Sequence, residues 1–261
     1  MAEPVLLYET RENGRIVIMT MNRPQQLNAL TTELNNAIVE GWERFAADDN
    51  AWVAIITGAG DRSFSAGVDL KETVAVREGR IPPPPPWRPI LPPDFTNHWK
   101  PTIAAINGYA FAGGFIVAHR CDIRIAAEHA QMGISEARWN MPTGWVHDLT
   151  RYIGLGHALE LVLWGDTVIT AQRAYEMGWV NKVVPKEKLM EEALAWADRM
   201  LYLAPRVVRN GKQLLYRGWD MDVMSGRALG RVLDQQLEGM EDSLEGPRAF
   251  TEKRRPQFKN R

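Results

Sequence analysis

The sequence predicts an α/β fold followed by a C-terminal part made of helices. Short β-prone runs alternate with helical segments in the order strand, strand, helix, repeated along the chain. Two of these runs end in small-residue turns that lead directly into a helix, and β-prone runs stop after Lys186. We therefore expect a core in residues 1–195 and a helical region in residues 196–261.

The composition indicates a folded chain without strong charge bias. It has 261 residues, of which 45% are hydrophobic, and this is enough to bury a sizeable core. The 31 basic and 32 acidic residues nearly cancel, so we expect no overall attraction to nucleic acid or to an anionic membrane. Any anion that the protein binds must be bound locally.

Cysteine and histidine usage argues against a disulfide or a metal site. The single cysteine, Cys121, lies in an apolar run, and the five histidines lack the spacing of zinc ligands. The N-terminus has no charged flank followed by a long apolar core, and no run of about 18 apolar residues occurs. We expect a soluble, cytoplasmic protein without metal.

The first elements are a β-hairpin and an amphipathic helix. The runs Leu6–Thr10 and Ile16–Met21 flank Asn13 and Gly14, a pair that favours a hairpin turn. A helix is expected from about Thr32. Its core face combines four apolar side chains at helical spacing, Leu34, Ile38, Trp42 and Phe45.

Two later turns can expose backbone amides at the start of a helix. The strand 53–57 is followed by the segment 63–71, which passes through small residues into a helix. The apolar run from Ile103 reaches Gly113 and Gly114 and then becomes a second apolar segment. Free amides at a helix N-terminus bind anions, so these turns offer the two halves of an oxyanion hole. An isolated pair of glycines more often serves to let a helix pack closely on a strand than to bind an anion.

A proline-rich segment interrupts this pattern at residues 82–93. Such a run excludes a regular helix or strand and is stiff and extended. We expect a rigid surface loop at the rim of a pocket, and a partner-binding segment is the less common alternative.

One glutamate, Glu136, is surrounded by apolar residues. Burial raises the pKa of a carboxyl group and suits it to proton transfer near neutral pH. A solvated glutamate beside Arg138 is the alternative. His147 and Asp148 are a weaker candidate for an acid/base pair, because adjacent residues on a helix point in different directions.

The rest of the chain is mainly helical. A turn at residues 141–144 leads into a helix that carries Tyr152, and Thr170 caps a short helix that Gly178 ends. Residues 179–184 are expected to form a strand. Three helices follow, one with Leu189 to Leu201 on its core face, one after Pro205 and one from about Val223 to Met240.

Four motifs in order carry a family resemblance. They are Asn22-Arg23-Pro24 with Leu27-Asn28-Ala29-Leu30; residues Phe64 to Lys71; Ala104 to Asp122 with Ala112-Gly113-Gly114; and Ala249 to Arg254. Together they resemble the crotonase family of enoyl-CoA hydratases and isomerases over nearly the whole chain. The resemblance implies a spiral of ββα repeats with a C-terminal α-helical trimerisation region, assembled as a homotrimer or a dimer of trimers. It also implies an acyl-CoA thioester substrate and no separate cofactor, because coenzyme A is part of the substrate.

The resemblance also implies site residues. The amides of Val68 and Gly113 would form the oxyanion hole for a thioester enolate, and Glu136 would be the catalytic acid/base. The expected substrate contacts are Ala66, Asp69, Leu70, Lys71, Gly114, Ile116, Trp139, Trp145, Phe250 and Lys253. Of these, residues 69–71 would lie beside the nucleotide and pantetheine, with Phe250 and Lys253 reaching that part from the C-terminal region.

One position departs from the family pattern. Hydratases of the family place a glutamate three residues after the oxyanion glycine, and this chain has Ile116 there. An isoleucine can neither hold water nor move a proton, so a double-bond isomerase with Glu136 as its single base is the favoured interpretation. A specialised hydratase or hydrolase in which Glu136 activates water, helped by His147 or Asp148, stays open. So does a non-catalytic scaffold that binds CoA or protein. The tryptophans favour a bulky, branched or cyclic acyl group.

Overall fold

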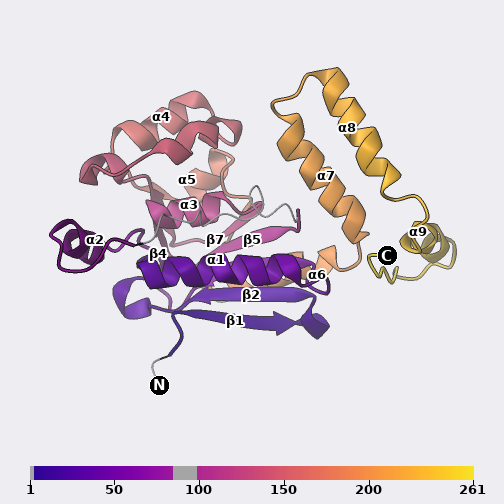
Figure 1. Ribbon diagram of the computed structural model, residues 1–261, viewed down its shortest axis with the longest axis horizontal. Helices are drawn as coiled ribbons and strands as arrows, with labels where there is room; N and C mark the ends of the chain where they lie inside the picture. The colour runs from indigo at the N-terminus through magenta and orange to yellow at the C-terminus, as the bar shows by residue number, and fades with distance from the viewer. Residues whose placement is uncertain (1–2, 85–98) are drawn as a thin grey trace.

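The fold contains two β-sheets, and in each of them neighbouring strands follow the order of the chain. The computed structural model describes residues 3–84 and 99–261 (Figure 1). The larger sheet has six strands in the order β1 (Leu6–Arg11), β2 (Ile16–Met21), β3 (Val53–Gly58), β5 (Thr102–Ile106), β7 (Ile123–Ala127) and β10 (Lys182–Val184). β1 and β2 pair antiparallel as a hairpin, and the other neighbours are parallel.

The smaller sheet brings together short strands that follow the strands of the larger one. Its order is β4 (Ser63–Ser65), β6 (Tyr109–Phe111), β8 (Gln131–Gly133) and β9 (Ile169–Thr170). β4, β6 and β8 are parallel, and β9 joins antiparallel. Since β4 leads into α2 and β6 leads into α3, the parallel pairing of β4 with β6 sets the starts of two helices side by side.

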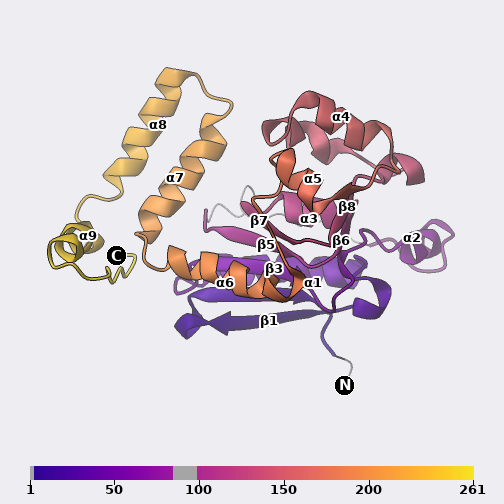
Figure 2. The same cartoon turned by 180° about the vertical axis from the view of Figure 1, so that it is seen from behind.

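The described part of the chain also contains α-helices, some of which cover the faces of the larger sheet. They are α1 (Thr32–Ala47), α2 (Leu70–Arg77), α3 (Gly113–His119), α4 (Leu155–Leu163), α5 (Ala171–Glu176), α6 (Leu189–Met200), α7 (Pro205–Gly218), α8 (Val223–Gln235) and α9 (Asp242–Thr251). Short 3₁₀ helices are η1 (Glu12–Gly14), η2 (Pro24–Gln26), η3 (Glu136–Trp139), η4 (Gly144–Arg151) and η5 (Lys186–Lys188). In Figures 1 and 2, α1 lies across one face of the sheet and α6 across the other.

Strand β3 is buried on both of its faces, one covered by α1 and the other by α6. All six of its residues are buried. Ala54 and Ile56 belong to the core cluster that contains α1, and Val53 and Ile55 belong to the cluster that contains α6. A parallel strand covered on both faces is nearly all apolar, which explains the apolar run from Val53 to Ile56 in the sequence.

The C-terminal helices leave the sheet after α6. α7 and α8 form an antiparallel pair that projects away from the sheets, and α9 lies beyond them (Figure 1). The predicted boundary between residues 195 and 196 falls within α6, which packs on the larger sheet through Leu189, Ala193 and Ala197. In the described part of the chain, no helix combines the length and the apolar character needed to cross a membrane.

Most predicted elements are confirmed, and the differences have local causes. β6 was not predicted, because its three residues follow Gly108 and looked like one run with β5. Residues 144–151 form a 3₁₀ helix, and the separate helix α4 follows them. The expected strand 179–184 is shortened to β10, the helix from Val223 ends at Gln235, and α9 was missed because it contains Pro247. Of the proline-rich segment 82–93, residues 85–93 lie outside the described ranges, and Pro82–Pro84 are exposed without regular structure.

Candidate active site

Two loops meet at the edge of the smaller sheet. One follows β4 and the other follows β6. The Gly67 carbonyl accepts a hydrogen bond from the Leu30 amide at 2.8 Å, and the Ala112 amide donates to the Gly133 carbonyl at 3.0 Å. Gly67 has a φ of +88°, and a Cβ on it would lie 2.8 Å from the Phe111 carbonyl oxygen. The two loops therefore touch through their backbones, and a residue with a side chain would separate them.

Each loop presents a free amide at this contact. The amides of Val68 and Gly113 donate to no acceptor within residues 3–84 and 99–261. They are near neighbours, because a Cβ on Gly113 would lie 3.5 Å from the Val68 nitrogen. Ala112, just before α3, has a φ of +48°, a conformation that costs a residue with a Cβ about 1–3 kcal/mol. Two adjacent N–H groups at the start of a helix form a site for a developing oxyanion.

A cavity of about 520 Å³ opens beside these amides. Its lining comes from four segments: the loop after β4, the start of α3, η3, and the stretch from Met141 to Trp145. The lining residues are Ala66, Val68, Leu70, Ala112, Ile116, Ser135, Glu136, Trp139, Met141, Pro142, Gly144 and Trp145. Most of these side chains are apolar, so the cavity suits an apolar group.

Glu136 is the one carboxylate among these described lining residues. It is only 5% exposed, so the alternative of a solvated surface glutamate is wrong. Its Oε1 accepts a hydrogen bond from Trp145 Nε1 at 3.2 Å, and its buried Oε2 has no partner. Burial raises the pKa of Glu136, and the hydrogen bonds from its own backbone, Trp145 and Ser135 oppose that shift only in part. A buried carboxyl with one oxygen free is suited to proton transfer.

Ile116 lies one turn along α3 from Gly113 and faces the cavity. Ile116 therefore contributes an apolar side chain to the cavity that Glu136 also lines. Gly114, the other predicted residue of this helix, packs against the backbone of Ser65 and does not line the cavity.

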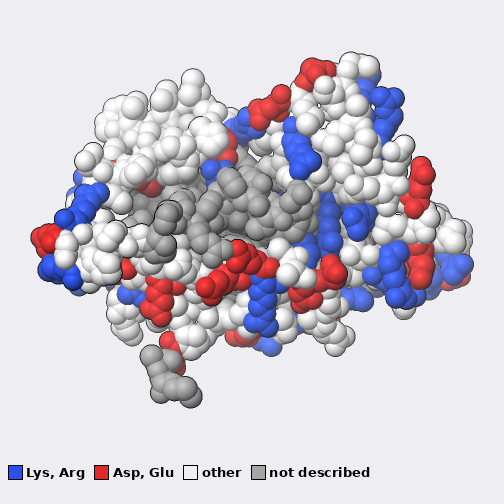
Figure 3. All heavy atoms as spheres, in the orientation of Figure 1, with Lys and Arg blue, Asp and Glu red and all other residues white. Residues whose placement is uncertain are grey.

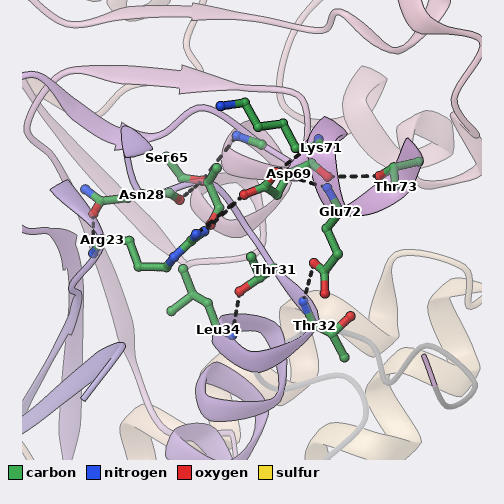
Figure 4. Close-up of polar contacts among 12 residues, drawn as sticks. Arg23, Asn28, Thr31, Thr32, Leu34, Ser65, Asp69, Lys71, Glu72 and Thr73 are labelled. Atoms are coloured by element: carbon green, nitrogen blue, oxygen red, sulfur yellow. Dashed lines mark hydrogen bonds and ion pairs between the residues drawn. The ribbon is translucent and has the colours of Figure 1, made fainter. Parts of the chain in front are cut away.

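Residues 69–71 lie at the start of α2 (Figure 4). The Asp69 carboxylate caps the helix by accepting from the Lys71 amide at 3.1 Å and the Glu72 amide at 3.3 Å, and it pairs with Arg23 at 3.4 Å. Its side chain is occupied by these contacts and does not line the cavity, whereas Leu70 does. Lys71 is exposed on α2.

A further contact fixes the orientation of α2. Glu72 accepts a hydrogen bond from the Thr32 amide at 2.9 Å, and this ties α2 to the first turn of α1 (Figure 4). Asp69 and Glu72 thus hold the start of α2 in place, and of these residues only Leu70 lines the cavity.

Phe250 and Lys253 lie far from this cavity in their own chain. Phe250 is on α9 and is 85% exposed, and Lys253 follows the end of that helix. In Figure 1, α9 and α2 are at opposite ends of the molecule. The structure therefore does not bring these two predicted contacts to the cavity of the same chain.

The predicted pairing of His147 with Asp148 is wrong. His147 is exposed, and its Nδ1 lies 3.1 Å from the Gly144 carbonyl oxygen. Asp148 points the other way and pairs with His119 and Arg120 at the end of α3. Sequence reasoning missed both partners, because they lie almost 30 positions earlier in the chain. Within the described residues, no group of three or more His, Cys, Asp or Glu could hold a metal ion.

Comparisons with known proteins identify the family of the chain. Residues 11–261 match the family model described as enoyl-CoA hydratase/isomerase. The chain is 34% identical over 258 residues to an (E)-benzylidenesuccinyl-CoA hydratase of Thauera aromatica, covering 95% of this chain and 96% of the relative. It is 36% identical over 249 residues to a 2,3-dehydroadipyl-CoA hydratase of Escherichia coli, with the same two coverages.

Solved structures confirm the predicted fold. A crystal structure of an enoyl-CoA hydratase from Bacillus anthracis superposes with a TM-score of 0.87 at 31% identity, covering 98% of this chain and all of the other. An enoyl-CoA hydratase/isomerase from Mycobacterium paratuberculosis gives a TM-score of 0.88 at 29% identity, covering 98% of this chain and 99% of that one.

Proposed function

Because the chain belongs to the enoyl-CoA hydratase/isomerase family, also called the crotonase family, we propose that it adds water to the double bond of an enoyl-CoA thioester. Glu136 is the single catalytic carboxylate in this proposal, and the Val68 and Gly113 amides hold the thioester oxygen. The observation that carries it is the Oε2 atom of Glu136, which is buried and unpartnered in the cavity that the oxyanion loops border.

The proposed reaction returns the base to its starting state. The Glu136 carboxylate takes a proton from water as the water oxygen bonds to C3. The electron pair of the C2–C3 double bond moves toward the thioester, and the resulting enolate oxygen accepts hydrogen bonds from the two amides. The protonated Glu136 then gives its proton to C2, and the carbonyl forms again. The net change is one water added and no change in the protein.

The names of the relatives support hydration over isomerisation. Both relatives described above are hydratases, and they match almost their whole length. The name of the T. aromatica enzyme specifies an acyl group with a benzylidene substituent. A large planar group of that kind is compatible with a cavity walled by Trp139, Trp145 and Ile116. We propose that the acyl group bound by this chain also has a bulky or cyclic apolar part.

Isomerisation is the second candidate, and Ile116 favours it. With no second acidic group to hold a water, Glu136 can instead take a proton from C2 of a 3-enoyl thioester. The same proton returned to C4 moves the double bond into conjugation, and the dienolate oxygen uses the same two amides.

Mass spectrometry in heavy-oxygen water separates the two reactions. The purified protein is incubated with straight-chain, branched and aryl 2-enoyl-CoA and 3-enoyl-CoA thioesters. Hydration adds one water that carries the heavy oxygen, and E136Q abolishes the gain. If the double bond moves without a gain of mass, hydration is wrong and isomerisation is the reaction. Free coenzyme A released with a labelled acid would instead identify a hydrolase.

Assembly as a homotrimer or dimer of trimers stays part of the proposal. Figure 3 shows an area over α4 with few charged side chains. Large apolar side chains are exposed on α4 and just after it, namely Leu155, Leu159, Leu163, Trp164 and Val168. Others are exposed on the C-terminal helices, namely Val207, Leu215, Val223, Met224 and Val232. Apolar area of this kind is usual at contacts between subunits. Sedimentation equilibrium should give a mass of three or six chains, and a monomer would contradict the assembly.

A further inference from the structure

We propose that Trp145 is a positioning residue for Glu136, and that His119, Arg120 and Asp148 hold Trp145 in place. This inference deepens the proposed function, because it rests on Glu136 as the base. In this proposal the end of α3 also holds Trp145, in addition to the oxyanion amide of Gly113 and the apolar wall at Ile116.

The contact between Trp145 and Glu136 selects one oxygen of the carboxyl group. Trp145 Nε1 donates to Oε1 at 3.2 Å, and Oε2 is left buried without a partner. No other side chain hydrogen-bonds to this carboxyl group in the described part of the chain. Because the indole N–H occupies Oε1, it fixes the rotation of the carboxyl group and leaves Oε2 for the substrate or water.

Trp145 is held through contacts with α3. Its ring centroid lies 5.8 Å from that of Phe115 and 6.1 Å from that of His119. Its backbone carbonyl accepts a hydrogen bond from Arg120 Nη2 at 3.4 Å. Arg120 Nη1 also forms an ion pair with Asp148, three residues after Trp145. Both ends of this turn of η4 are therefore attached to α3.

The hydrogen bonds of His119 and Asp148 define one proton arrangement for the cluster, in which Arg120 Nε is the buried nitrogen left without a partner among the described residues. Trp179 Nε1 donates to His119 Nδ1 at 3.2 Å, so Nδ1 is the acceptor and the imidazole proton is on Nε2. Nε2 lies 3.1 Å from Asp148 Oδ1 and donates to it. Burial lowers the pKa of His119, and the hydrogen bond to Asp148 opposes that shift only in part. Burial acts to raise the pKa of Asp148, but the hydrogen bond from His119 and the charge of Arg120 lower it to about 2. Asp148 is thus held as the partner of Arg120 in the ion pair.

Residues of α3 at a spacing of three or four serve the whole site. Gly113 supplies an oxyanion amide, Ile116 forms the apolar wall, and His119 and Arg120 hold the turn that orients the base. Because one short helix makes all three contacts, it sets the position of Glu136 relative to the oxyanion hole. The position of a base relative to an oxyanion hole strongly affects the reaction rate, since a shift of about 1 Å can lower the rate about 10²-fold.

The charged groups around Glu136 support a readout based on pH. No other titratable side chain lines the cavity among the described residues. Directly after α3, Arg120 is paired with Asp148. On η4, His147 is exposed and Arg151 pairs with Asp220. On α4, Glu160 pairs with His157 and Arg173, and on α2, Arg77 reaches the Met141 sulfur. Burial and the hydrogen bonds from Trp145 and the backbone therefore set the pKa of Glu136.

W145F tests the contact, because phenylalanine keeps an aromatic ring and removes the N–H. The donor lowers the pKa of Glu136, so its loss should raise that pKa and move the acid limb of the pH–rate profile to higher pH. We expect kcat to fall about 10²-fold, with a smaller change in KM. W139F is the matched control, because it makes the same exchange of indole for phenyl in the cavity wall at a residue that does not hydrogen-bond to Glu136. We expect W139F to change KM and to leave the acid limb of the pH–rate profile in place. W164F, on the exposed end of α4, should change neither.

D148N tests the support behind Trp145. It should move the acid limb in the same direction as W145F, and the double variant should be no worse than W145F alone, because both act through one contact. If D148N does not fold by circular dichroism, R120Q carries the same test, since it removes the contacts of Arg120 with Asp148 and Trp145. An unchanged acid limb in W145F overturns the positioning role, and additive effects in the double variant overturn the role of the cluster.

An infrared titration distinguishes failure of this inference from failure of the proposed function. The carboxyl band of Glu136 is obtained as the difference between wild type and E136Q, and its pKa is read from the band as pH varies. W145F should raise this pKa even if the reaction is not hydration. An active E136Q would refute the proposed base and leave this measurement intact, whereas an unshifted band in W145F would refute the positioning role by itself.

Discussion

Gly114 lies directly against the carbonyl group of Ser65: a Cβ on Gly114 would be only 2.1 Å from that oxygen. This contact packs the first turn of α3 onto β4 without any intervening side chain. Because β4 leads to Val68 and α3 begins at Gly113, the same contact brings the two free amides together. The oxyanion site therefore depends on a glycine that makes no contact with the cavity.

G114A should accordingly destabilise the protein and reduce activity together. No side-chain rotation relieves a clash between a Cβ and a backbone carbonyl, so α3 must move off β4. We expect a loss of about 1–3 kcal/mol in the free energy of unfolding, measured by chemical denaturation. Gly156 is the matched control, because nothing lies within 4 Å of a Cβ placed there. G156A should gain about 0.5–1 kcal/mol from its helical position on α4. Equal stability of the two variants would contradict the packing argument.

E136Q should abolish activity without weakening the fold at neutral pH. The folded pKa of Glu136 is raised, mainly by burial, so the folded state holds its proton more tightly than the unfolded state does. The contribution of this group to stability is therefore fully present below the unfolded pKa and is lost as pH rises through the folded pKa. Glutamine does not ionise, so E136Q does not lose stability in this way as pH rises. The unfolding free energy of E136Q relative to wild type should increase from pH 4 to pH 7.5, and a decrease over that range would contradict the assigned pKa direction.

I116E should place a second carboxylate in the cavity of Glu136. Two carboxylates close together raise the pKa of one of them, so the acid limb of the pH–rate profile should move to higher pH. I116Q has nearly the same shape and no charge, so it should leave the limb close to that of wild type. Both variants should raise KM for apolar acyl groups, because each makes the wall at Ile116 polar. If I116E and I116Q have the same pH profile, residue 116 does not face Glu136 closely enough to couple with it.

Local sequence patterns were sufficient for the elements whose cause is local. The Asn13-Gly14 turn, the apolar face of α1, the Thr170 cap and the buried strands β3 and β5 were all predicted and are confirmed. For Glu136 the sequence left two alternatives, a buried carboxyl among apolar residues and a solvated one beside Arg138, and the structure shows the buried one. The glycine turns were recognised for the same reason, since a tight approach of backbones requires residues without a Cβ.

Contacts between distant segments were not predictable from the same patterns. Nothing in the sequence around Asp148 points to His119 and Arg120, and the adjacent His147 was a misleading partner. The capping role of Asp69 was likewise hidden, because an N-cap and a ligand contact use the same residue type. Phe250 and Lys253 were placed by resemblance alone, and the distance of α9 from the cavity depends on the path of the whole C-terminal region (Figure 2).

K212M should detach α7 from the larger sheet. Lys212 Nζ lies 2.6 Å from Asp122 Oδ2 and 2.8 Å from the Lys100 carbonyl oxygen, and Tyr216 donates to Asp122 Oδ1 at 3.0 Å. The Lys212 and Asp122 side chains are only 8% and 15% exposed. Removal of one partner from a buried ion pair leaves the other charge uncompensated, which typically costs about 3–5 kcal/mol.

The control for K212M is a lysine of the same type in an exposed pair. Lys188 and Glu191 are 60% and 69% exposed, so K188M should change the free energy of unfolding far less than K212M does. Both variants are compared with wild type by chemical denaturation at low and high salt. The effect of K212M should persist at high salt, because a buried pair is screened less than an exposed one. If K212M and K188M cost the same, α7 is held to the sheet by its apolar contacts, and the Asp122 pair does not anchor it.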